Sequence, residues 1–308
     1  MSRIVISEFM DEQAVAQLRA GHDVLYDPKL VDDPVRLHAQ AARADVLIVR
    51  NRTQVRGELL AALGKARIVG RLGVGLDNID VTACEARGIQ VIPATGANAL
   101  SVAEYVIATA MLLLRGAYQA STDVAGGAWP RNALGNGREI GGKTLGLVGF
   151  GSIGQLTAKL AQGIGMNVIA FDAMLAPEYP VFASSGVRRA TLDELCAQAD
   201  VISLHVPLVE STRHLFDATR VAAMKRGSVL INSARGGVLD EAAVAAALKS
   251  GQLGGAAIDV FESEPLPAGS VFAGCPNLVL TPHIAGLSAE SNERVSSLIA
   301  QRVLEELR

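Results

Sequence analysis

The chain has 308 residues, of which 50% are hydrophobic and 19% are charged, and its formal net charge is −3. This length is typical of about two domains, and the composition excludes a disordered chain. The small negative charge provides no basic field for binding nucleic acid or an anionic membrane surface.

Apolar runs typical of buried strands alternate with helical patterns in the first third of the chain. The expected strands are "RIVIS", "DVLYD", "DVLIV", "RIVGRLG" and "IQVIPA", and the expected helices lie near 11–20, 34–43, 57–63 and 80–87. A helix over 99–115 follows, and then an irregular glycine-rich arm. The lone tryptophan of this arm, Trp129, fits either a core position or an interface.

The alternation restarts after the arm. The expected strands are "TLGLVGFG", "NVIAFD", "DVISLHVP", "GSVLINSA", "GGAAIDVF" and "LVLTPH", and the last helix is expected over 288–307. Strands that alternate with helices predict parallel sheets covered on both faces. The sequence therefore predicts two α/β domains.

Cysteine spacing and hydropathy indicate the compartment. Cys84, Cys196 and Cys275 are far apart and match no disulfide or metal-binding pattern. We therefore expect no metal, and we expect a reducing, cytoplasmic setting. The N-terminal apolar run is too short for a signal peptide. The longest apolar stretch, 105–114, is shorter than the ~20 residues of a membrane-spanning helix, so we expect no membrane association.

The strongest local motif is G-x-G-x-x-G, formed by Gly149, Gly151 and Gly154 between an apolar strand and an amphipathic helix. Such glycines permit a tight turn, close approach of a pyrophosphate and close packing of helix on strand. Asp172 ends the next strand, where a carboxylate accepts hydrogen bonds from ribose hydroxyls and repels a 2′-phosphate. We therefore expect a dinucleotide site that prefers NAD to NADP.

Two of the five histidines are placed for acid–base chemistry. His205 and His283 both end predicted strands, where doubly wound sheets bind ligands. Pro282 before His283, and the small residues Ala285 and Gly286 after it, favour His283 as a residue that takes and returns a proton. A buried, hydrogen-bonded imidazole without a catalytic role remains the alternative.

A carboxylate and a guanidinium could complete the site. Glu264 precedes Pro265, which favours an extended backbone and a fixed direction. A carboxylate against an imidazole fixes the tautomer of the ring. Arg235 follows a predicted strand, and its guanidinium matches a substrate carboxylate with two parallel hydrogen bonds, although a surface ion pair would also explain it.

Seven stretches, in order, resemble the D-isomer-specific 2-hydroxyacid dehydrogenase family, and especially its phosphoglycerate-dehydrogenase-like branch. They are "GRLGVGLDNID" (70–80), "ANALSVAEYVIA" (97–108), "GKTLGLVGFGSIG" (142–154), "HVPLVEST" (205–212), "MKRGSVLINSARGGVLDEAAV" (224–244), "AAIDVFESEPLP" (256–267) and "LTPHIAG" (280–286). The resemblance spans essentially the whole chain. It implies hydride transfer between the 2-hydroxyl carbon of a small anionic 2-hydroxy acid and NAD, which gives the 2-keto acid.

The resemblance also implies roles for particular residues. Arg235 would bind the substrate carboxylate, Glu264 would hold the histidine, and His283 would be the general acid/base. The implied cofactor contacts are Gly149, Gly151, Ser152, Ile153, Gly154, Asp172, His205, Pro207, Thr212, Ala234, Asp259 and Gly286. The implied substrate contacts, besides Arg235 and His283, are Asn51, Val74 and Gly75.

The family architecture implies two Rossmann-like or flavodoxin-like parallel-sheet domains with an interdomain cleft. Residues 1–97 and 284–308 would form a discontinuous substrate domain, and residues 98–283 the NAD-binding Rossmann domain inserted in it. The helix and arm at 98–140 match the segment that joins two copies in a homodimer.

The identity of the hydroxy acid stays open. Arg50 and Arg52 flank Asn51, and Arg71 lies in "GRLGVG", so these arginines either make surface ion pairs or bind a second anionic group, with Arg52 as our candidate contact. Substrates of the 3-phosphoglycerate, 3-sulfolactate or hydroxypyruvate type are expected. "RNRT" followed by "GRLGVGLDN" faintly resembles the sulfolactate dehydrogenases.

Two other functions are compatible with these motifs. Some relatives of this fold are non-enzymatic, NAD-sensing corepressors that keep much of the same site. Formate dehydrogenases also resemble the chain, but they pair the histidine with glutamine, and Glu264 argues against that activity.

Overall fold

The computed structural model describes residues 1–117, 120–176 and 179–308, and these divide into two compact units. Unit 1 comprises Met1–Asn98 and Leu287–Arg308, and unit 2 comprises Ala99–Gly286. The second of these boundaries lies three residues after the expected one at 283. The extra residues belong to unit 2 because Asp259 binds the backbone amides of Ile284 and Ala285.

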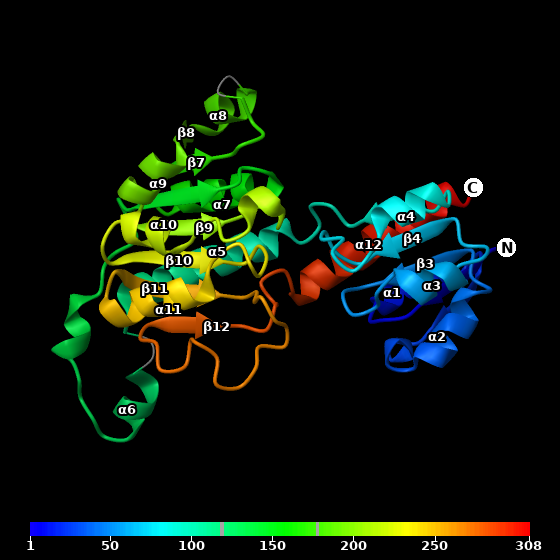
Figure 1. Ribbon diagram of the computed structural model, residues 1–308, viewed down its shortest axis with the longest axis horizontal. Coiled ribbons are helices and arrows are strands. Elements are labelled where there is room, and N and C mark those ends of the chain that lie inside the picture. The colour runs from blue at the N-terminus through cyan, green and yellow to red at the C-terminus, as the bar shows by residue number, and fades with distance from the viewer. Residues whose placement is uncertain (118–119, 177–178) are drawn as a thin grey trace. The chain divides into compact units, whose positions relative to one another are not determined.

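Unit 1 is built on a five-stranded parallel sheet in the order β2-β1-β3-β4-β5 (Figure 1). Its strands are β1 (Arg3–Ile6), β2 (Asp23–Tyr26), β3 (Val46–Val49), β4 (Ile68–Arg71) and β5 (Gln90–Pro93). Its helices are α1 (Glu12–Arg19), η1 (Leu30–Asp32), α2 (Pro34–Ala41), α3 (Gly57–Ala62), α4 (Val81–Ala86) and α12 (Ala289–Glu306). Side chains from α1 and α12 pack on one face of the sheet and those from α2, α3 and α4 on the other.

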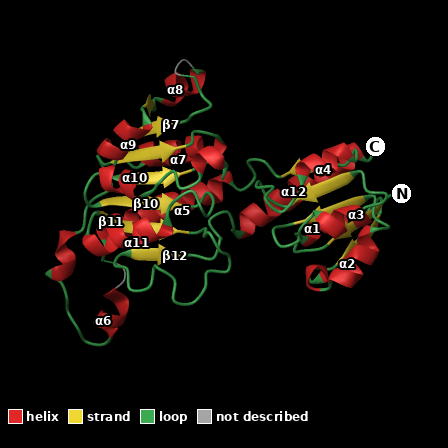
Figure 2. Ribbon diagram, viewed as in Figure 1, coloured by secondary structure: helices red, strands yellow, loops and turns green. Residues whose placement is uncertain are grey.

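Unit 2 is built on a seven-stranded parallel sheet in the order β12-β11-β10-β9-β6-β7-β8 (Figure 2). Its strands are β6 (Thr144–Val148), β7 (Asn167–Phe171), β8 (Arg188–Arg189), β9 (Val201–Leu204), β10 (Ser228–Asn232), β11 (Leu253–Ile258) and β12 (Leu278–Leu280). β9 and β10 are fully buried, as expected for strands covered on both faces. The strand order changes direction between β6 and β9, which is where doubly wound sheets bind ligands.

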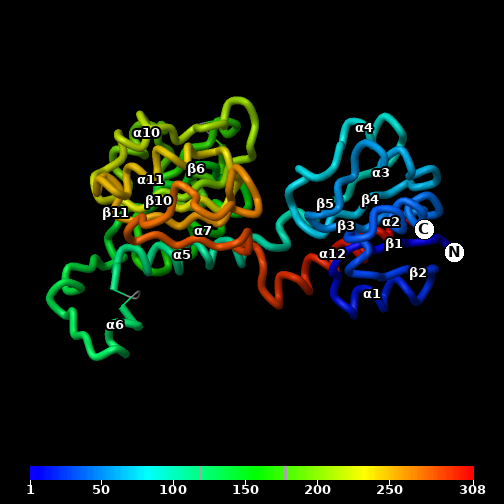
Figure 3. The backbone as a smooth tube through the Cα atoms, turned by 60° about the horizontal axis from the view of Figure 1, so that its bottom comes forward, coloured from blue at the N-terminus to red at the C-terminus, as the bar shows by residue number. Residues whose placement is uncertain are grey.

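The helices of unit 2 cover both faces of this sheet (Figure 3). They are α5 (Ala99–Arg115), α6 (Ser121–Ala125), η3 (Ala133–Asn136), α7 (Ser152–Gly163), α8 (Pro180–Ser185), α9 (Leu192–Gln198), η4 (Glu210–Thr212), α10 (Ala218–Ala223) and α11 (Glu241–Ser250). Side chains of α5 and α7 pack on one face, and those of α9, α10 and α11 pack on the other. The segment that carries α6 projects away from the sheet (Figures 1 and 3).

Aspartates start many of these helices. Side chains of Asp11, Asp33, Asp80, Asp217 and Asp240 accept hydrogen bonds from backbone amides in the first turns of α1, α2, α4, α10 and α11. A carboxylate in this position satisfies an amide that has no partner within the helix and also favours the positive end of the helix dipole. Each of these five helices therefore begins where the sequence provides a capping acid.

The strands and helices expected in chain order are all present, apart from small shifts at their ends. Several short elements of unit 2 were not predicted, among them α6, α8, β8, η3 and η4. β8 pairs with the edge of the sheet through only two arginines, which carry no apolar pattern. Among the described residues, no helix combines the length and apolar character needed to cross a membrane.

Candidate active site

The glycine motif connects β6 to α7. Gly149 has a left-handed backbone, with φ of 97°, and a Cβ there would lie 2.6 Å from the carbonyl oxygen of His205. A Cβ on Gly154 would lie 2.4 Å from the carbonyl oxygen of Gly149, so α7 packs directly on the turn. At Gly151, by contrast, the space that a Cβ would occupy is open. The motif thus has two glycines that packing requires and one that faces open space, as a dinucleotide pyrophosphate needs.

The start of α7 fits an anion. Gly151 is its N-cap and provides no side-chain hydrogen bond to the first-turn amides. Ser152 is exposed and Ile153 half-buried in that first turn. Helix N-termini with available amides bind phosphate groups through those donors and through the helix dipole. The residues present therefore fit the pyrophosphate of NAD.

Asp172 follows β7 and lies against the same turn. One carboxylate oxygen accepts from the amide of Phe150 at 2.8 Å, and the other accepts from the amide of Met174 at 2.8 Å. A carboxylate oxygen has two lone pairs, so each can accept a second hydrogen bond. The side chain is thereby fixed beside the motif with acceptor capacity for ribose hydroxyls.

Asp172→Ala should raise KM for NAD about tenfold, the effect of losing one hydrogen bond to a charged group. It should also narrow the NAD/NADP ratio of kcat/KM, because the charge that repels a 2′-phosphate is removed. Asp217→Ala is the matched control, because Asp217 also accepts a backbone hydrogen bond but caps α10. The measurement is kcat/KM with each cofactor, and an unchanged ratio in Asp172→Ala would contradict the assignment.

His205 follows β9, next to the glycine motif. Its amide donates to the carbonyl oxygen of Val148 at 2.7 Å, and its Nε2 lies 3.0 Å from the Ser203 hydroxyl. Burial lowers the pKa of His205 to about 4. In the same loop, the Thr212 hydroxyl donates to the carbonyl oxygen of Pro207 at 2.6 Å and fixes the loop backbone. A neutral imidazole in this place fits a structural or cofactor-side role better than acid–base chemistry.

The lowered pKa of His205 predicts acid sensitivity. The unfolded chain takes up the proton first, so stability that is complete above about pH 6.5 is lost as the pH falls towards about 4, by up to roughly 3 kcal/mol. His205→Gln should reduce this loss. The check is the thermal midpoint of both proteins at pH 7 and pH 5, and equal decreases would contradict the prediction.

The three expected catalytic residues follow three adjacent strands. Arg235 follows β10, Glu264 follows β11 and His283 follows β12. Because these strands are parallel and neighbouring, their carboxyl ends lie on one edge of the sheet, the edge that also carries the glycine motif. This topology gathers residues that lie far apart in the sequence.

Glu264 and His283 form a direct pair. His283 Nδ1 lies 2.8 Å from Glu264 Oε2, and Glu264 Oε1 accepts from the amide of Phe261 at 3.0 Å. An ionised carboxylate only accepts, so Nδ1 carries a proton and Nε2 is the nitrogen available for proton exchange with a substrate. The His283 side chain is 45% exposed, so solvent and small molecules reach it.

The loop that carries Arg235 is fixed by its backbone. Asn232 is buried at the end of β10, donates to the carbonyl oxygen of Arg235 at 3.0 Å and accepts from the amide of Ala234 at 3.1 Å. A Cβ on Gly236 would lie 1.8 Å from the carbonyl oxygen of Phe261. The Arg235 loop therefore rests directly on the loop that carries Glu264.

Asp259 holds the backbone around His283. Its buried carboxylate accepts from the amides of Ile284 and Ala285, both at 2.8 Å, and from the Thr281 hydroxyl at 2.6 Å. Its carbonyl oxygen accepts from the amide of His283 at 2.8 Å. His283 has a left-handed backbone, with φ of 56°, which residues other than glycine adopt uncommonly. The carboxylate expected beside the cofactor thus faces the 281–285 loop, and Gly286 ends the unit just beyond it.

A second histidine–glutamate pair lies on the same edge. His214 Nε2 lies 2.9 Å from Glu262 Oε1, and the amide of Glu262 donates to Glu241 at 2.8 Å. Burial raises the pKa of Glu241. This pair resembles the His283 pair in distance and exposure, and it provides a matched control for experiments.

The expected substrate contacts of unit 1 lie at the carboxyl ends of its own strands. Asn51 and Arg52 are exposed after β3, and Val74 and Gly75 are half-buried after β4. Arg52 forms an ion pair with Asp32.

Glu8, which sequence reasoning missed, organises the first of these loops. It is 4% exposed, and its carboxylate accepts from the amides of Arg50, Arg52 and Thr53 at 2.8 to 3.0 Å. The available signal was an acid directly after a buried strand.

The other two arginines considered for a second anion are engaged by the chain. Arg50 donates to Asn292 at 2.5 Å and lies over the ring of Phe9, and Arg71 donates to the carbonyl oxygen of Leu72 at 2.8 Å. Burial lowers the pKa of Arg50. In the part of the chain that the structure describes, no group of three or more histidine, cysteine, aspartate or glutamate side chains is placed to hold a metal ion.

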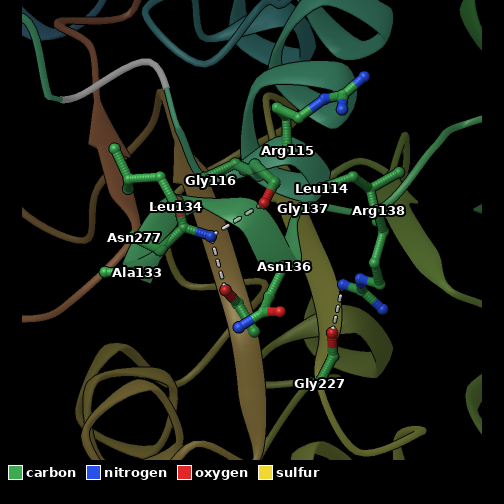
Figure 4. A pocket seen from close by; sticks show the side chains of 12 residues that line it. Leu114, Arg115, Gly116, Ala133, Leu134, Asn136, Gly137, Arg138, Gly227 and Asn277 are labelled. Atoms are coloured by element: carbon green, nitrogen blue, oxygen red, sulfur yellow. Dashed lines mark hydrogen bonds between the residues drawn. The ribbon is translucent and has the colours of Figure 1, made fainter. Parts of the chain in front are cut away.

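A pocket of about 440 Å³ lies at the opposite edge of the seven-stranded sheet (Figure 4). It is bounded by the end of α5, by residues 133–138 and by the starts of β10, β11 and β12. Asn277 donates across it to carbonyl oxygens of Leu113 and Gly254, and Arg138 donates to that of Gly227. Asn277 and Arg138 thus bind the chain's own backbone, and the pocket is separate from the candidate active site.

Comparison with known proteins defines the class. Residues 107–285 match the family described as "D-isomer specific 2-hydroxyacid dehydrogenase, NAD binding domain". The chain belongs to this family, and it is an NAD-dependent oxidoreductase.

Two curated relatives and one solved structure illustrate the likeness. The chain is 53% identical to the (S)-sulfolactate dehydrogenase of Chromohalobacter salexigens, over 98% of this chain and 97% of that enzyme. It is 37% identical to the D-3-phosphoglycerate dehydrogenase of Methanocaldococcus jannaschii, over the whole of this chain but only 58% of that enzyme. A D-lactate dehydrogenase of Aquifex aeolicus, solved with NAD and lactic acid, superposes with a TM-score of 0.84 at 27% identity, over 99% of this chain and 95% of that one.

Proposed function

We propose that the chain interconverts a small 2-hydroxy acid and its 2-keto acid, with 3-sulfolactate and sulfopyruvate as the preferred pair. The observation that carries the chemistry is the Glu264–His283 pair, which leaves Nε2 available at the edge of the sheet that also carries the glycine motif. The choice of substrate is supported by the 53% identity to a (S)-sulfolactate dehydrogenase over nearly the full length of both chains.

In this proposal each residue has one task. Arg235 binds the carboxylate of the substrate with two hydrogen bonds. His283 Nε2 takes the proton of the 2-hydroxyl group, and Glu264 stabilises the imidazolium that results. The chemistry that NAD supplies when bound is acceptance of a hydride. In the reducing direction His283 returns the proton to the carbonyl oxygen.

The remaining residues bind rather than react. We assign the NAD-binding role to unit 2, through the glycine motif, Asp172, the loop from His205 to Thr212, Ala234, Asp259 and Gly286. We assign the substrate-domain role to unit 1, through Asn51, Arg52 and the backbone at Val74 and Gly75. For Arg52 to bind a second anion, that anion must compete with Asp32.

The test is NADH oxidation with sulfopyruvate, phosphohydroxypyruvate, hydroxypyruvate and oxaloacetate. We expect the highest kcat/KM with sulfopyruvate. A higher kcat/KM with another of these acids would refute sulfopyruvate as the preferred substrate but would leave the proposed reaction class standing. Turnover below ~0.01 s⁻¹ on all four, against typical enzyme rates of 1–10³ s⁻¹, would refute the activity and favour a non-enzymatic NAD-binding role.

We also propose that two copies of the chain form a homodimer through the helix and arm at 98–140, and that the protein works in the cytoplasm. Residues 118 and 119 of this segment lie outside the described residues. Trp129 is 79% exposed and Met111 on α5 is 45% exposed, which supports an apolar contact with a second copy. Cys84, Cys196 and Cys275 are free thiols, which supports a reducing compartment. Light scattering of Trp129→Ala should show dissociation, and an unchanged mass would oppose Trp129 as the anchor.

A further inference from the structure

Tyr105, on α5, is linked to the His283 loop by side-chain hydrogen bonds. Its hydroxyl lies 2.7 Å from the Thr281 hydroxyl, and the Thr281 hydroxyl lies 2.6 Å from Asp259 Oδ1. The same Asp259 oxygen accepts from the amide of Ile284. Three side chains, from α5 and from the ends of β11 and β12, thus form one hydrogen-bonded series that reaches the loop of the candidate acid/base, His283.

The direction of this chain is fixed by chemistry. An ionised carboxylate has no proton to donate, so Thr281 donates to Asp259. A hydroxyl has one proton, so Thr281 must accept from Tyr105, and Tyr105 is the donor. Burial raises the pKa of Tyr105 to about 12, and the phenol keeps its proton across the working range of an enzyme. Each side chain in this hydrogen-bonded series therefore has a fixed role: Tyr105 donates, Thr281 accepts and donates, and Asp259 accepts.

The residues that this chain reaches hold His283 in an uncommon conformation. The backbone of His283 is left-handed, and its amide donates to the carbonyl oxygen of Asp259 at 2.8 Å. Left-handed backbone is costly for residues other than glycine, so it persists only where surrounding contacts stabilise it. The contacts of Asp259 with Ile284, Ala285 and Thr281 supply that stabilisation.

The helix that carries the first donor, Tyr105, is fixed by packing. Tyr105 lies on the long helix α5, which packs on β10, β11 and α7 through buried side chains that include Val106 and Ala110 (Figures 1 and 3). A donor on such an element is held in place before substrate arrives, which is how supporting residues fix the geometry of a site.

We propose that Tyr105 and Thr281 are positioning residues for the dehydrogenase reaction, which act through Asp259 to hold the His283 backbone so that Nε2 meets the substrate hydroxyl. This inference rests on the proposed function, in which His283 is the acid/base. The two residues touch neither substrate nor cofactor in this scheme and reach the assigned cofactor contact Asp259 only through its Oδ1, so their effect falls mainly on turnover.

The test compares Tyr105→Phe, Thr281→Val and the double variant. We expect kcat to fall about tenfold in Tyr105→Phe and more in Thr281→Val, the effects of removing one and two hydrogen bonds, with little change in the KM of the keto acid or the Kd of NADH. The double variant should be no slower than Thr281→Val, because both changes break one chain. Thr281→Ser, which keeps the hydroxyl, should restore most of the activity.

Two controls make the same atomic changes elsewhere. Thr109→Val alters a buried threonine one turn further along α5, whose hydroxyl bonds only to its own helix, and Tyr26→Phe removes a phenol that donates to Met10 in unit 1. Both should keep kcat within about twofold, because these hydroxyls bond to the backbone of α5 and to Met10 and not to the 281–285 loop. If they slow the enzyme as much as Tyr105→Phe, or if Thr281→Ser fails to restore turnover, the positioning role is wrong.

An activity-independent measurement separates this inference from the proposed function. Imidazole NMR signals of His283, assigned by their loss in His283→Gln, should shift in Tyr105→Phe and Thr281→Val but not in Thr109→Val. If His283→Gln abolishes turnover while Tyr105→Phe and Thr281→Val change neither kcat nor these signals, the inference fails and the proposed function stands. If His283→Gln retains turnover, the proposed function fails, and the inference fails with it.

Discussion

Replacement of His283 by glutamine is expected to lower kcat by roughly 10²- to 10⁴-fold, the contribution typical of a general acid–base group. Glutamine keeps a polar side chain near Glu264 but cannot take and return a proton. The loss should appear in both directions of the reaction, with the Kd of NADH unchanged. Steady-state rates with the best keto acid, together with a binding titration of NADH, measure the effect.

His214→Gln is the matched control for this change. His214 forms a pair with Glu262 at 2.9 Å and is as exposed as His283. It lies in the loop after β9, however, and its partner Glu262 donates its amide to Glu241. We expect its kcat within about twofold of the wild type, as for other changes of exposed side chains. Equal losses in both variants would mean that the pairs share a structural role and that His283 is not the acid/base.

Much of the fold follows from local patterns. β9 and β10 are buried along their whole length, so they are apolar runs that a periodicity argument finds. The glycine motif is recognised from its local spacing, and Gly154 is required by a contact within the motif, although the contact that requires Gly149 is with the carbonyl of the distant His205. β8 lacks such a signal, because two arginines at a sheet edge need no apolar side chains.

The sequence predicts the reactive residues of the site but not the residues that support them. Arg235, Glu264 and His283 could be selected because each follows a predicted strand, and parallel strands bring such positions to one edge. The supporting contacts could not be selected in this way. Glu8 bonds to the amide of a residue 42 positions away, and Tyr105 reaches Thr281 across 176 positions. Such contacts depend on how strands and helices stack, which no spacing within the sequence encodes.

Asp259 illustrates the same limit. The resemblance implies a cofactor contact for Asp259, and the structure adds that both carboxylate oxygens accept hydrogen bonds from the 281–285 loop. The sequence identifies such a residue as part of the site. Only the three-dimensional arrangement shows that this acid also shapes the backbone around a reactive residue.

Arg235→Lys is expected to lower kcat/KM for the keto acid by roughly 100-fold, because an ammonium group cannot form the two parallel hydrogen bonds of a guanidinium with a carboxylate. KM for the keto acid should rise, and the Kd of NADH should stay the same. Arg235 Nη1 also donates to the carbonyl oxygen of Ala234 at 2.6 Å, so thermal unfolding must show that the loop remains folded.

The control for this prediction is Arg220→Lys, which makes the same change in an arginine that pairs with Asp193 on the helical surface of unit 2. It should leave kcat/KM within about twofold, because exposed ion pairs contribute little. Added guanidinium should partly restore Arg235→Ala, since the missing group can enter the space left by the side chain. If Arg235→Lys is as mild as Arg220→Lys, then Arg235 makes only a surface ion pair, and the substrate carboxylate must be bound by other residues.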